Sequence, residues 1–419
     1  MIEKETVMIL GAGASAHLNF ALGTELVEDI VRLIFGNSTG VKKIKDASGG
    51  RVVQHAINNS VLLEKFLELS KQTKADGKKY TSKDIEKFGQ SLFHAQPPSI
   101  DFYLQKNPQY ALLGKLAIVL CLSRHEDKDS WQNAPYKYPH RLYEEFPRFG
   151  WYKYLWDSLS CECDKYEDFK KNKVTIITYN YDRSLENYLI NAIQNYFNVS
   201  EADAAEAFNT IKIYHVYGKL GKFYWEVNYL EDSSDKTPDG IMMETNDFTP
   251  WEPRVLFRLM SSENDSVEYG MSEDDFNPSR NVLSYENKTK IVDRFNAAAK
   301  GIMTFCEATS GHNKDIFSDA IRKAERVYFL GFGFQIENIK ILGTLSKEEL
   351  NQGKSLLRDT AKIYGTAYSK SYSEVDKIIY KFHNLWFVPI SDIKITNKWL
   401  GCDSEDIISC FMREIAPLV

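Results

Sequence analysis

The segment Val7-Met8-Ile9-Leu10-Gly11-Ala12-Gly13-Ala14-Ser15-Ala16 lies close to the start of a chain of 419 residues. Its first four residues form a short apolar run that is typical of a buried strand, and the glycines after them predict a tight turn. A helical pattern of apolar residues follows around Leu22 to Phe35. The order of strand, glycine turn and helix indicates the first unit of a Rossmann-type domain.

Several later segments have the character of the first strand. Each is rich in β-branched or aromatic residues, and each of the first three ends in a polar or glycine turn, as buried parallel strands do. They are Val174–Thr178, Ile211–Val216 and Arg326–Leu330, followed by the candidates Ala361–Tyr364 and Leu385–Val388. We therefore predict an α/β fold, with a Rossmann-like parallel sheet flanked by helices.

The chain between the first helix and the second predicted strand is mostly helical in pattern. Apolar residues recur at helical spacing around Leu62–Leu67 and Leu112–Leu120. This pattern predicts a helical lobe, residues 36–154, inserted into a Rossmann-type domain made of residues 1–35 and 155–419.

Composition and charge restrict the class of protein. The net charge of −6 gives the whole chain no electrostatic footprint for nucleic acid, so we expect no direct nucleic-acid binding. No stretch approaches the roughly 20 apolar residues that span a bilayer, and the first residues lack the layout of a signal peptide, so we expect a cytoplasmic protein without a membrane partner. The six cysteines include no C-x-x-C pair, so we expect no metal site.

The turn Gly11-x-Gly13-x-x-Ala16 fits the dinucleotide-binding fingerprint with alanine in the third place. Glycines let the backbone approach a pyrophosphate, and the start of the next helix supplies N–H donors and a positive dipole end. The acidic residue that ends a second strand about 20 residues later in dehydrogenases is missing here, which argues against that class. An ordinary βα turn is the alternative interpretation.

Polar residues follow the next predicted strand, in the segment Thr178-Tyr179-Asn180-Tyr181-Asp182. Ligands of open α/β sheets bind at the carboxyl ends of the strands. Asn180 is therefore a candidate to bond a ribose or a water, and Asp182 a candidate to fix a partner in the same cavity. The alternative for Asp182 is that it caps the helix after it.

The segment Tyr214-His215-Val216-Tyr217-Gly218 ends the following predicted strand. His215 and Tyr217 lie on one face if the strand persists that far, and Gly218 allows a ligand to approach closely. His215 is either a functional residue or a structural histidine, and its place at a strand end favours function.

The fourth strand-end turn is Gly331-Phe332-Gly333-Phe334. Its glycines are candidates to seat a ribose or a phosphate. The alternative is a simple bend, with both phenylalanines in the core.

In this order, the four motifs resemble the sirtuin superfamily, which carries a Gly-Ala-Gly-x-Ser loop, a Thr-x-Asn-x-Asp segment, a His-Gly segment and a Gly-Thr-Ser turn. The corresponding segments are Gly11–Ser15, Thr178–Asp182, His215–Gly218 and Gly331–Phe334. The chain is more closely similar to the sirtuin-like NADases of bacterial anti-phage defence, such as those paired with a HerA-type ATPase. The segments that carry this narrower resemblance are Ser99–Phe102, Leu330–Asn338 and Ile363–Thr366.

The chain departs from sirtuins in three places. The paired cysteines of the sirtuin zinc module, which helps to form the acyl-peptide cleft, are absent, so the resemblance does not extend to deacylase activity. The sirtuin histidine that precedes glycine aligns most directly with Tyr217, two residues after His215. We assign the family's base to His215, because a tyrosine with a pKa of about 10 is a poor base near pH 7. The Gly-Thr-Ser hydroxyls have no counterpart in Gly331–Phe334.

The resemblance implies an NAD⁺ hydrolase that cleaves the nicotinamide–ribose bond, uses NAD⁺ as substrate, needs no metal, and works as a homo-oligomer with a HerA-like hexameric ATPase. The catalytic residues that it implies are Asn180, His215 and Asp182. The residues that it implies for NAD⁺ binding are Gly11, Ala12, Gly13, Ser15, Thr178, Tyr217, Gly218, Gly331 and Gly333. The alternative is a non-catalytic module that binds NAD⁺ or ADP-ribose and controls a partner, and the Tyr217 departure favours it. Cyclisation or transfer of ADP-ribose is a second enzymatic alternative.

Overall fold

The computed structural model describes residues 1–18, 20–35, 44–45, 51–52, 80–126, 150–221, 295–309, 313–368, 370–397, 407–414 and 416–418. The chain divides into two compact units, each of which is described by itself. The first unit is formed by Met1–Leu22, Asp129–Lys219 and Phe305–Val419, and the second by Gly23–Lys128 and Leu220–Thr304.

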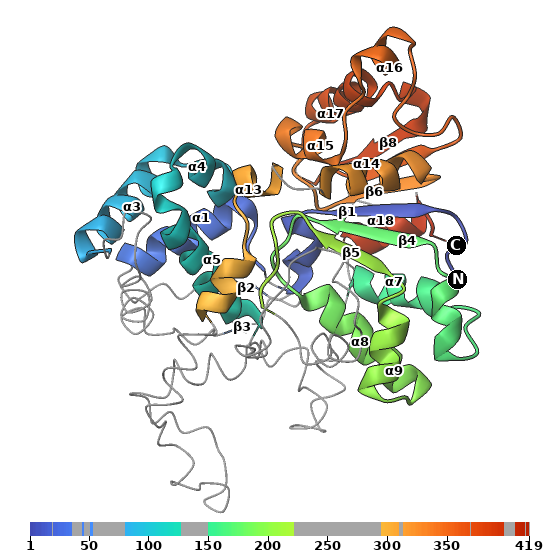
Figure 1. Cartoon of the computed structure of the whole chain (residues 1–419), viewed down its shortest axis with the longest axis horizontal. Coiled ribbons are helices and arrows are strands. Elements are labelled where there is room, and N and C mark those ends of the chain that lie inside the picture. The colour runs from blue at the N-terminus through green and yellow to red at the C-terminus, as the bar shows by residue number, and fades with distance from the viewer. Residues whose placement is uncertain are drawn as a thin grey trace, which may run out of the picture. The chain divides into compact units, whose positions relative to one another are not determined.

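The first unit is built on a six-stranded sheet in which all neighbouring strands are parallel (Figure 1). Its strands are β1 (Thr6–Leu10), β4 (Val174–Thr178), β5 (Lys212–His215), β6 (Arg326–Leu330), β7 (Lys362–Thr366) and β8 (Ile393–Thr396). Their order in space is β5-β4-β1-β6-β7-β8. Counted along the chain within this sheet, the order is 3-2-1-4-5-6, which is that of dinucleotide-binding Rossmann folds. The predicted α/β fold is confirmed.

The register of the sheet fixes which turns lie together. Leu10 at the end of β1 pairs with Thr178 of β4 on one side and with Leu330 of β6 on the other, and Thr178 pairs with His215 of β5. All five residues of β1 are buried. The turns that follow β1, β4, β5 and β6 therefore leave the same edge of the sheet, and the direction of strand order reverses between β1 and β6.

Helices flank this sheet (Figure 1). They are the short 3₁₀ segments η1 (Ala12–Leu18), η3 (Tyr166–Lys171) and η6 (Ile390–Asp392) and the helices α7 (Trp151–Ser160), α8 (Ser184–Phe197), α9 (Glu201–Phe208), α13 (Phe305–Thr309), α14 (Asn313–Lys323), α15 (Ile336–Leu342), α16 (Lys347–Asn351), α17 (Tyr372–Trp386) and α18 (Ile407–Glu414). Phe329 of β6 stacks on Phe382 and Trp386 of α17, and these aromatic rings form part of the buried core.

One predicted strand, Leu385–Val388, is wrong. Its first two residues are the last turn of α17, whose buried residues keep helical spacing as far as Trp386. Phe387 then adopts a left-handed backbone that ends the helix. The last strand of the sheet is β8, which the sequence pattern did not indicate.

The second unit contains the helices α1 (Gly23–Phe35), α3 (Ser82–Ala95), α4 (Ile100–Lys106) and α5 (Ala111–Glu126), the 3₁₀ turn η2 (Pro108–Tyr110), and the paired strands β2 (Ile44–Lys45) and β3 (Arg51–Val52). The apolar face of α1 packs on α3 and α5. The predicted boundary at residue 35 groups α1 with the sheet, whereas the structure groups it with these helices. The predicted helix around Leu62–Leu67 lies outside the described residues.

None of the helices in the described part of the chain combines the length and the apolar character that crossing a bilayer requires.

The turns after β1 and β6 are in backbone contact. Gly11 donates its N–H to the Leu330 carbonyl and Gly13 donates to the Gly331 carbonyl, both at 3.0 Å. Gly331 has a φ of +57°, and a Cβ atom there would lie 2.1 Å from the backbone nitrogen of Ala14. This close approach requires glycine, because a side chain at position 331 would collide with backbone atoms, which cannot move aside by changing rotamer.

Replacing Gly331 with alanine is expected to lower the free energy of unfolding by about 2–4 kcal/mol, since it combines a left-handed φ with a backbone collision. Gly353→Ala is the matched control: φ is +62° there, but nothing lies within 4 Å of the added Cβ. That variant is expected to lose only about 1–2 kcal/mol. Urea unfolding of both variants measures the difference, and equal losses would show that the two turns are not in contact.

Candidate functional site

All the predicted site residues belong to the first unit and lie on the four turns at the carboxyl edge of its sheet. The structure brings Ser15 from the first turn into contact with Asn180 and Asp182 from the second. Ser15 Oγ donates to Asp182 Oδ2 at 2.9 Å and accepts from Asn180 Nδ2 at 3.0 Å. A hydroxyl can do both at once. The Ser15 side chain is buried, whereas Asn180 is half-buried.

Asp182 is a buried carboxylate, and the donors that it meets among the described residues are neutral. Besides Ser15, it accepts from the backbone N–H of Ser184 at 3.2 Å and from the Ser184 hydroxyl, which is also bonded to Tyr152 OH at 2.8 Å. Burial raises the pKa of Asp182, and the hydrogen bonds from Ser184 and Ser15 only partly offset this effect. Asp182 bonds Ser184, the first residue of α8, and also Ser15. Each of its two predicted roles, as a cap of the helix and as a partner within the site, therefore corresponds to a contact in the structure.

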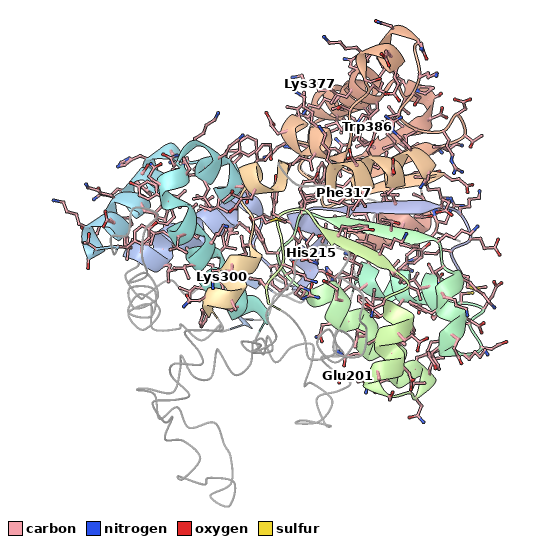
Figure 2. All side chains as sticks on the ribbon, in the orientation of Figure 1. Glu201, His215, Lys300, Phe317, Lys377 and Trp386 are labelled. Atoms are coloured by element: carbon pink, nitrogen blue, oxygen red, sulfur yellow. The ribbon has the colours of Figure 1, made fainter. Side chains whose placement is uncertain are left out.

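His215 lies at the end of β5 (Figure 2), with its side chain 5% exposed. Its Nδ1 is 2.9 Å from the backbone oxygen of Asn180, and its Nε2 is 2.8 Å from Oε1 of Glu186. A carbonyl oxygen and a carboxylate both accept hydrogen bonds, so each ring nitrogen must carry a proton for both bonds to form. In this arrangement the ring is bonded to the backbone of Asn180, and both of its nitrogens face acceptors.

Behind His215 lies a buried pair of opposite charges at the start of α8. Arg183 Nε donates to Glu186 Oε1 at 2.6 Å, and the two side chains are 2% and 5% exposed. Burial alone would raise the pKa of Glu186, but the charges of Arg183 and His215 and the hydrogen bonds from both hold it well below its usual range. The sequence reasoning missed this pair, for which the only signal is the spacing of three residues between Arg183 and Glu186 in the first turn of a helix.

The condition under which Tyr217 would share a face with His215, a strand that persists to Tyr217, is not met, because β5 ends at His215 and a turn follows. The Tyr217 hydroxyl donates to Oδ1 of Asn338 in α15 at 2.7 Å. Gly218 has a φ of +75°, which suits this turn. The sequence reasoning did not single out Asn338, whose role depends on a contact 121 residues away along the chain.

The remaining predicted residues lie close to this cluster. Thr178 Oγ1 accepts from the backbone N–H of Asn180 at 3.0 Å, and Trp151 Nε1 donates to the backbone oxygen of Ala14 at 2.7 Å, which braces the glycine turn. Ala12 and Gly13 are half-buried, and they are the first two residues of the 3₁₀ helix η1. Gly333 is exposed, with nothing within 4 Å of where its Cβ would lie. Both Phe332 and Phe334 are buried.

Within the described residues, no three histidine, cysteine, aspartate or glutamate side chains are grouped so that they could hold a metal ion.

Comparison with protein families, curated proteins and solved structures finds no match. The resemblance to sirtuin-like NADases therefore depends on sequence motifs alone, and the function that it implies stays a prediction.

Glu186→Gln is expected to lower the free energy of unfolding at pH 7 by about 3–5 kcal/mol, because it removes a buried carboxylate from beside the Arg183 guanidinium. Since the folded state lowers the pKa of Glu186 from 4.5, its contribution is fully present above that value and is lost as the pH falls below it. The stability difference between wild type and variant should therefore shrink in acid. Asp182 is present in both proteins, and the Glu186 charge is the smallest of the causes that shift its pKa, so its own titration largely cancels in the comparison.

The control is the double variant Arg183→Met/Glu186→Gln. Its loss should be smaller than the sum of the two single losses by about 1–3 kcal/mol, the coupling expected of side chains in contact. Denaturant unfolding at pH 7 and pH 3 gives all the values. Strict additivity, or a difference independent of pH, would mean that Glu186 is not an ionised partner of Arg183.

Proposed function

We propose that the chain binds NAD⁺ at the carboxyl edge of the first unit's sheet and hydrolyses its nicotinamide–ribose bond, giving nicotinamide and ADP-ribose, and so depletes NAD⁺ in anti-phage defence. The observation that carries the proposal is the position of Asn180. Its side chain is bonded to Ser15 of the glycine turn, which follows β1, one of the two strands between which the strand order reverses. In open α/β sheets the point of reversal is the usual ligand site.

The reaction makes modest demands on the protein. Nicotinamide leaves NAD⁺ as a neutral ring and needs no general acid, so the site must stabilise an oxocarbenium-like ribose and deliver a water, as in glycoside hydrolysis. Because the Asn180 amide nitrogen is fixed by Ser15, the amide oxygen has a defined direction. That oxygen carries partial negative charge, so it is suited both to stabilising the cation and to orienting the water.

His215 acts on the site through Asn180 in the proposed resting form, since it bonds the Asn180 backbone oxygen. The predicted role as general base requires the ring to give up a proton and one of its two hydrogen bonds first. Asp182 is proposed to support Ser15 and Asn180 rather than to contact the ribose. The diphosphate is assigned to the half-buried backbone of Ala12 and Gly13.

A non-catalytic module that binds NAD⁺ or ADP-ribose and controls a partner is the second candidate. It is favoured by one observation, that both ring nitrogens of His215 face acceptors. Incubating the pure chain with NAD⁺ separates the two: nicotinamide release supports the hydrolase, and binding without turnover supports the module. Analysis of the products separates hydrolysis from cyclisation or transfer of ADP-ribose.

The resemblance also suggests a cytoplasmic homo-oligomer that is activated with a HerA-type hexameric ATPase. The NAD⁺ incubation is therefore designed in two arms, with the chain alone and with such an ATPase added. A rate that rises only in the second arm would identify the ATPase as an activator.

Asn180→Ala is expected to reduce nicotinamide release by about 10²–10³-fold, the usual cost of removing one group that stabilises developing charge. Asn191→Ala is the matched control, since Asn191 is an exposed asparagine on α8 of the same unit and bonds only within that helix. It should release nicotinamide at the wild-type rate. Thermal unfolding of both variants checks that they are folded, and a folded Asn180→Ala protein of full activity would refute the assignment.

A further inference from the structure

Two tyrosine hydroxyls from one half of the sheet meet a single asparagine from the other half. Tyr179, directly after β4, donates to the backbone oxygen of Asn338 at 2.6 Å. Tyr217, just after β5, donates to the side-chain oxygen of the same residue at 2.7 Å. Asn338 belongs to α15, which follows β6. We call this set of three residues the tyrosine bridge.

The bridge crosses the place where the strand order reverses. Strands β4 and β5 lie on one side of β1, and β6 with α15 lies on the other. Tyr179 starts beside β1, because its backbone N–H bonds the Leu10 carbonyl at 2.8 Å. A side chain that leaves this position and bonds Asn338 must reach across the end of β1, where the glycine turn begins.

The bridge is a packed element and not a loose surface contact. The rings of Tyr179 and Tyr217 are in edge contact at 5.6 Å, and Tyr179 also meets Phe332 at 5.1 Å. The aromatic residues Tyr179, Tyr217 and Phe332 are all buried, with at most 8% exposed. Phe332 lies in the turn after β6, so both aromatic contacts and hydrogen bonds tie the two halves of the sheet together at the edge where the nucleotide is proposed to bind.

We propose that the tyrosine bridge is an autoinhibitory closure of the nucleotide site, which must open before NAD⁺ or ADP-ribose can reach the turn after β1. This inference rests on the proposed function and adds its regulation. A dinucleotide seated across the reversal point would occupy the space that these buried rings fill. The isolated chain is then mostly closed, and its apparent affinity is reduced by the fraction of molecules in the open form.

The two hydrogen bonds of the tyrosine bridge can be removed while its aromatic rings are kept. Tyr179→Phe/Tyr217→Phe deletes both hydroxyls and keeps both rings. Because two neutral hydrogen bonds are lost, the open fraction is expected to rise about tenfold or more. Tyr217→Phe alone, which removes one bond, is the milder second variant.

Tyr328→Phe is the matched control. Tyr328 is a buried tyrosine of β6 in the same sheet, and its hydroxyl also donates to a backbone carbonyl, that of Pro417 at 3.2 Å. This substitution removes a buried tyrosine hydroxyl that lies outside the tyrosine bridge. This control should keep the wild-type behaviour in every measurement below.

Two measurements are made on each full-length protein. Hydrogen exchange of the peptides covering residues 178–182 and 331–342 reports opening without any ligand. Calorimetric titration with ADP-ribose, followed by NAD⁺ with assay of nicotinamide release, reports access to the site. The double variant is expected to exchange faster in both peptides and to bind ADP-ribose about tenfold more tightly than wild type, with Tyr217→Phe in between.

The contrary outcomes are distinct. If wild type binds ADP-ribose as tightly as the double variant, or if exchange is unchanged, the bridge is not a closure, and the proposed function is unaffected. If the double variant exchanges faster yet neither it nor wild type binds ADP-ribose or NAD⁺, an open edge does not take the ligand. In that case the proposed function fails, and the closure inferred for it fails with it.

Discussion

The backbone contact between the turns after β1 and β6 is the constraint on which the rest of the carboxyl edge depends. The backbone of Gly331 can lie against the backbone of Gly13 and Ala14 only because Gly331 has no Cβ atom, which would collide with them. Ala14 lies in this contact, and Trp151 donates a hydrogen bond to its backbone oxygen. These two contacts determine where Ser15, the next residue, lies. Ser15 in turn aligns the side chains of the turn after β4. The polar cluster is thus built outward from glycine packing.

The two buried carboxyls at this edge differ in their surroundings. Asp182 and Glu186 are four residues apart, yet their pKa values shift in opposite directions, because the described donors to Asp182 are neutral whereas Glu186 faces Arg183 and His215. The carboxyl bonded to the glycine turn is therefore the one that takes up a proton more readily. An edge proposed to receive a diphosphate benefits, since proton uptake by Asp182 would relieve its repulsion of an incoming anion.

The parts of the structure that were predictable from sequence are those set by local chemistry. The apolar runs at β1, β4 and β6 have the β-branched and aromatic character of buried strands, and the polar residues after them had to gather at one edge once the sheet was parallel. Leu385–Val388 has the same composition but continues the apolar face of α17, so local pattern alone was ambiguous. Asn338 could not be found from local pattern, because its two tyrosine partners come from distant strands. The glycines of the fingerprint were anticipated for a ligand, which stays a prediction, and in the structure they also make room for another turn of the same chain.

The tyrosine bridge and the histidine are mechanically connected. Tyr217 and His215 lie on either side of the point where β5 ends, and Gly218 with its left-handed φ follows directly. In the proposed closure, movement of Tyr217 away from Asn338 would displace the turn that directly follows His215. In the proposed hydrolase, such a motion would admit the nucleotide and could part a ring nitrogen from its acceptor, after which that nitrogen must give up its proton before it can serve as a base. For a hydrolase whose unchecked activity would consume the cell's own NAD⁺, a closed resting chain would be an advantage.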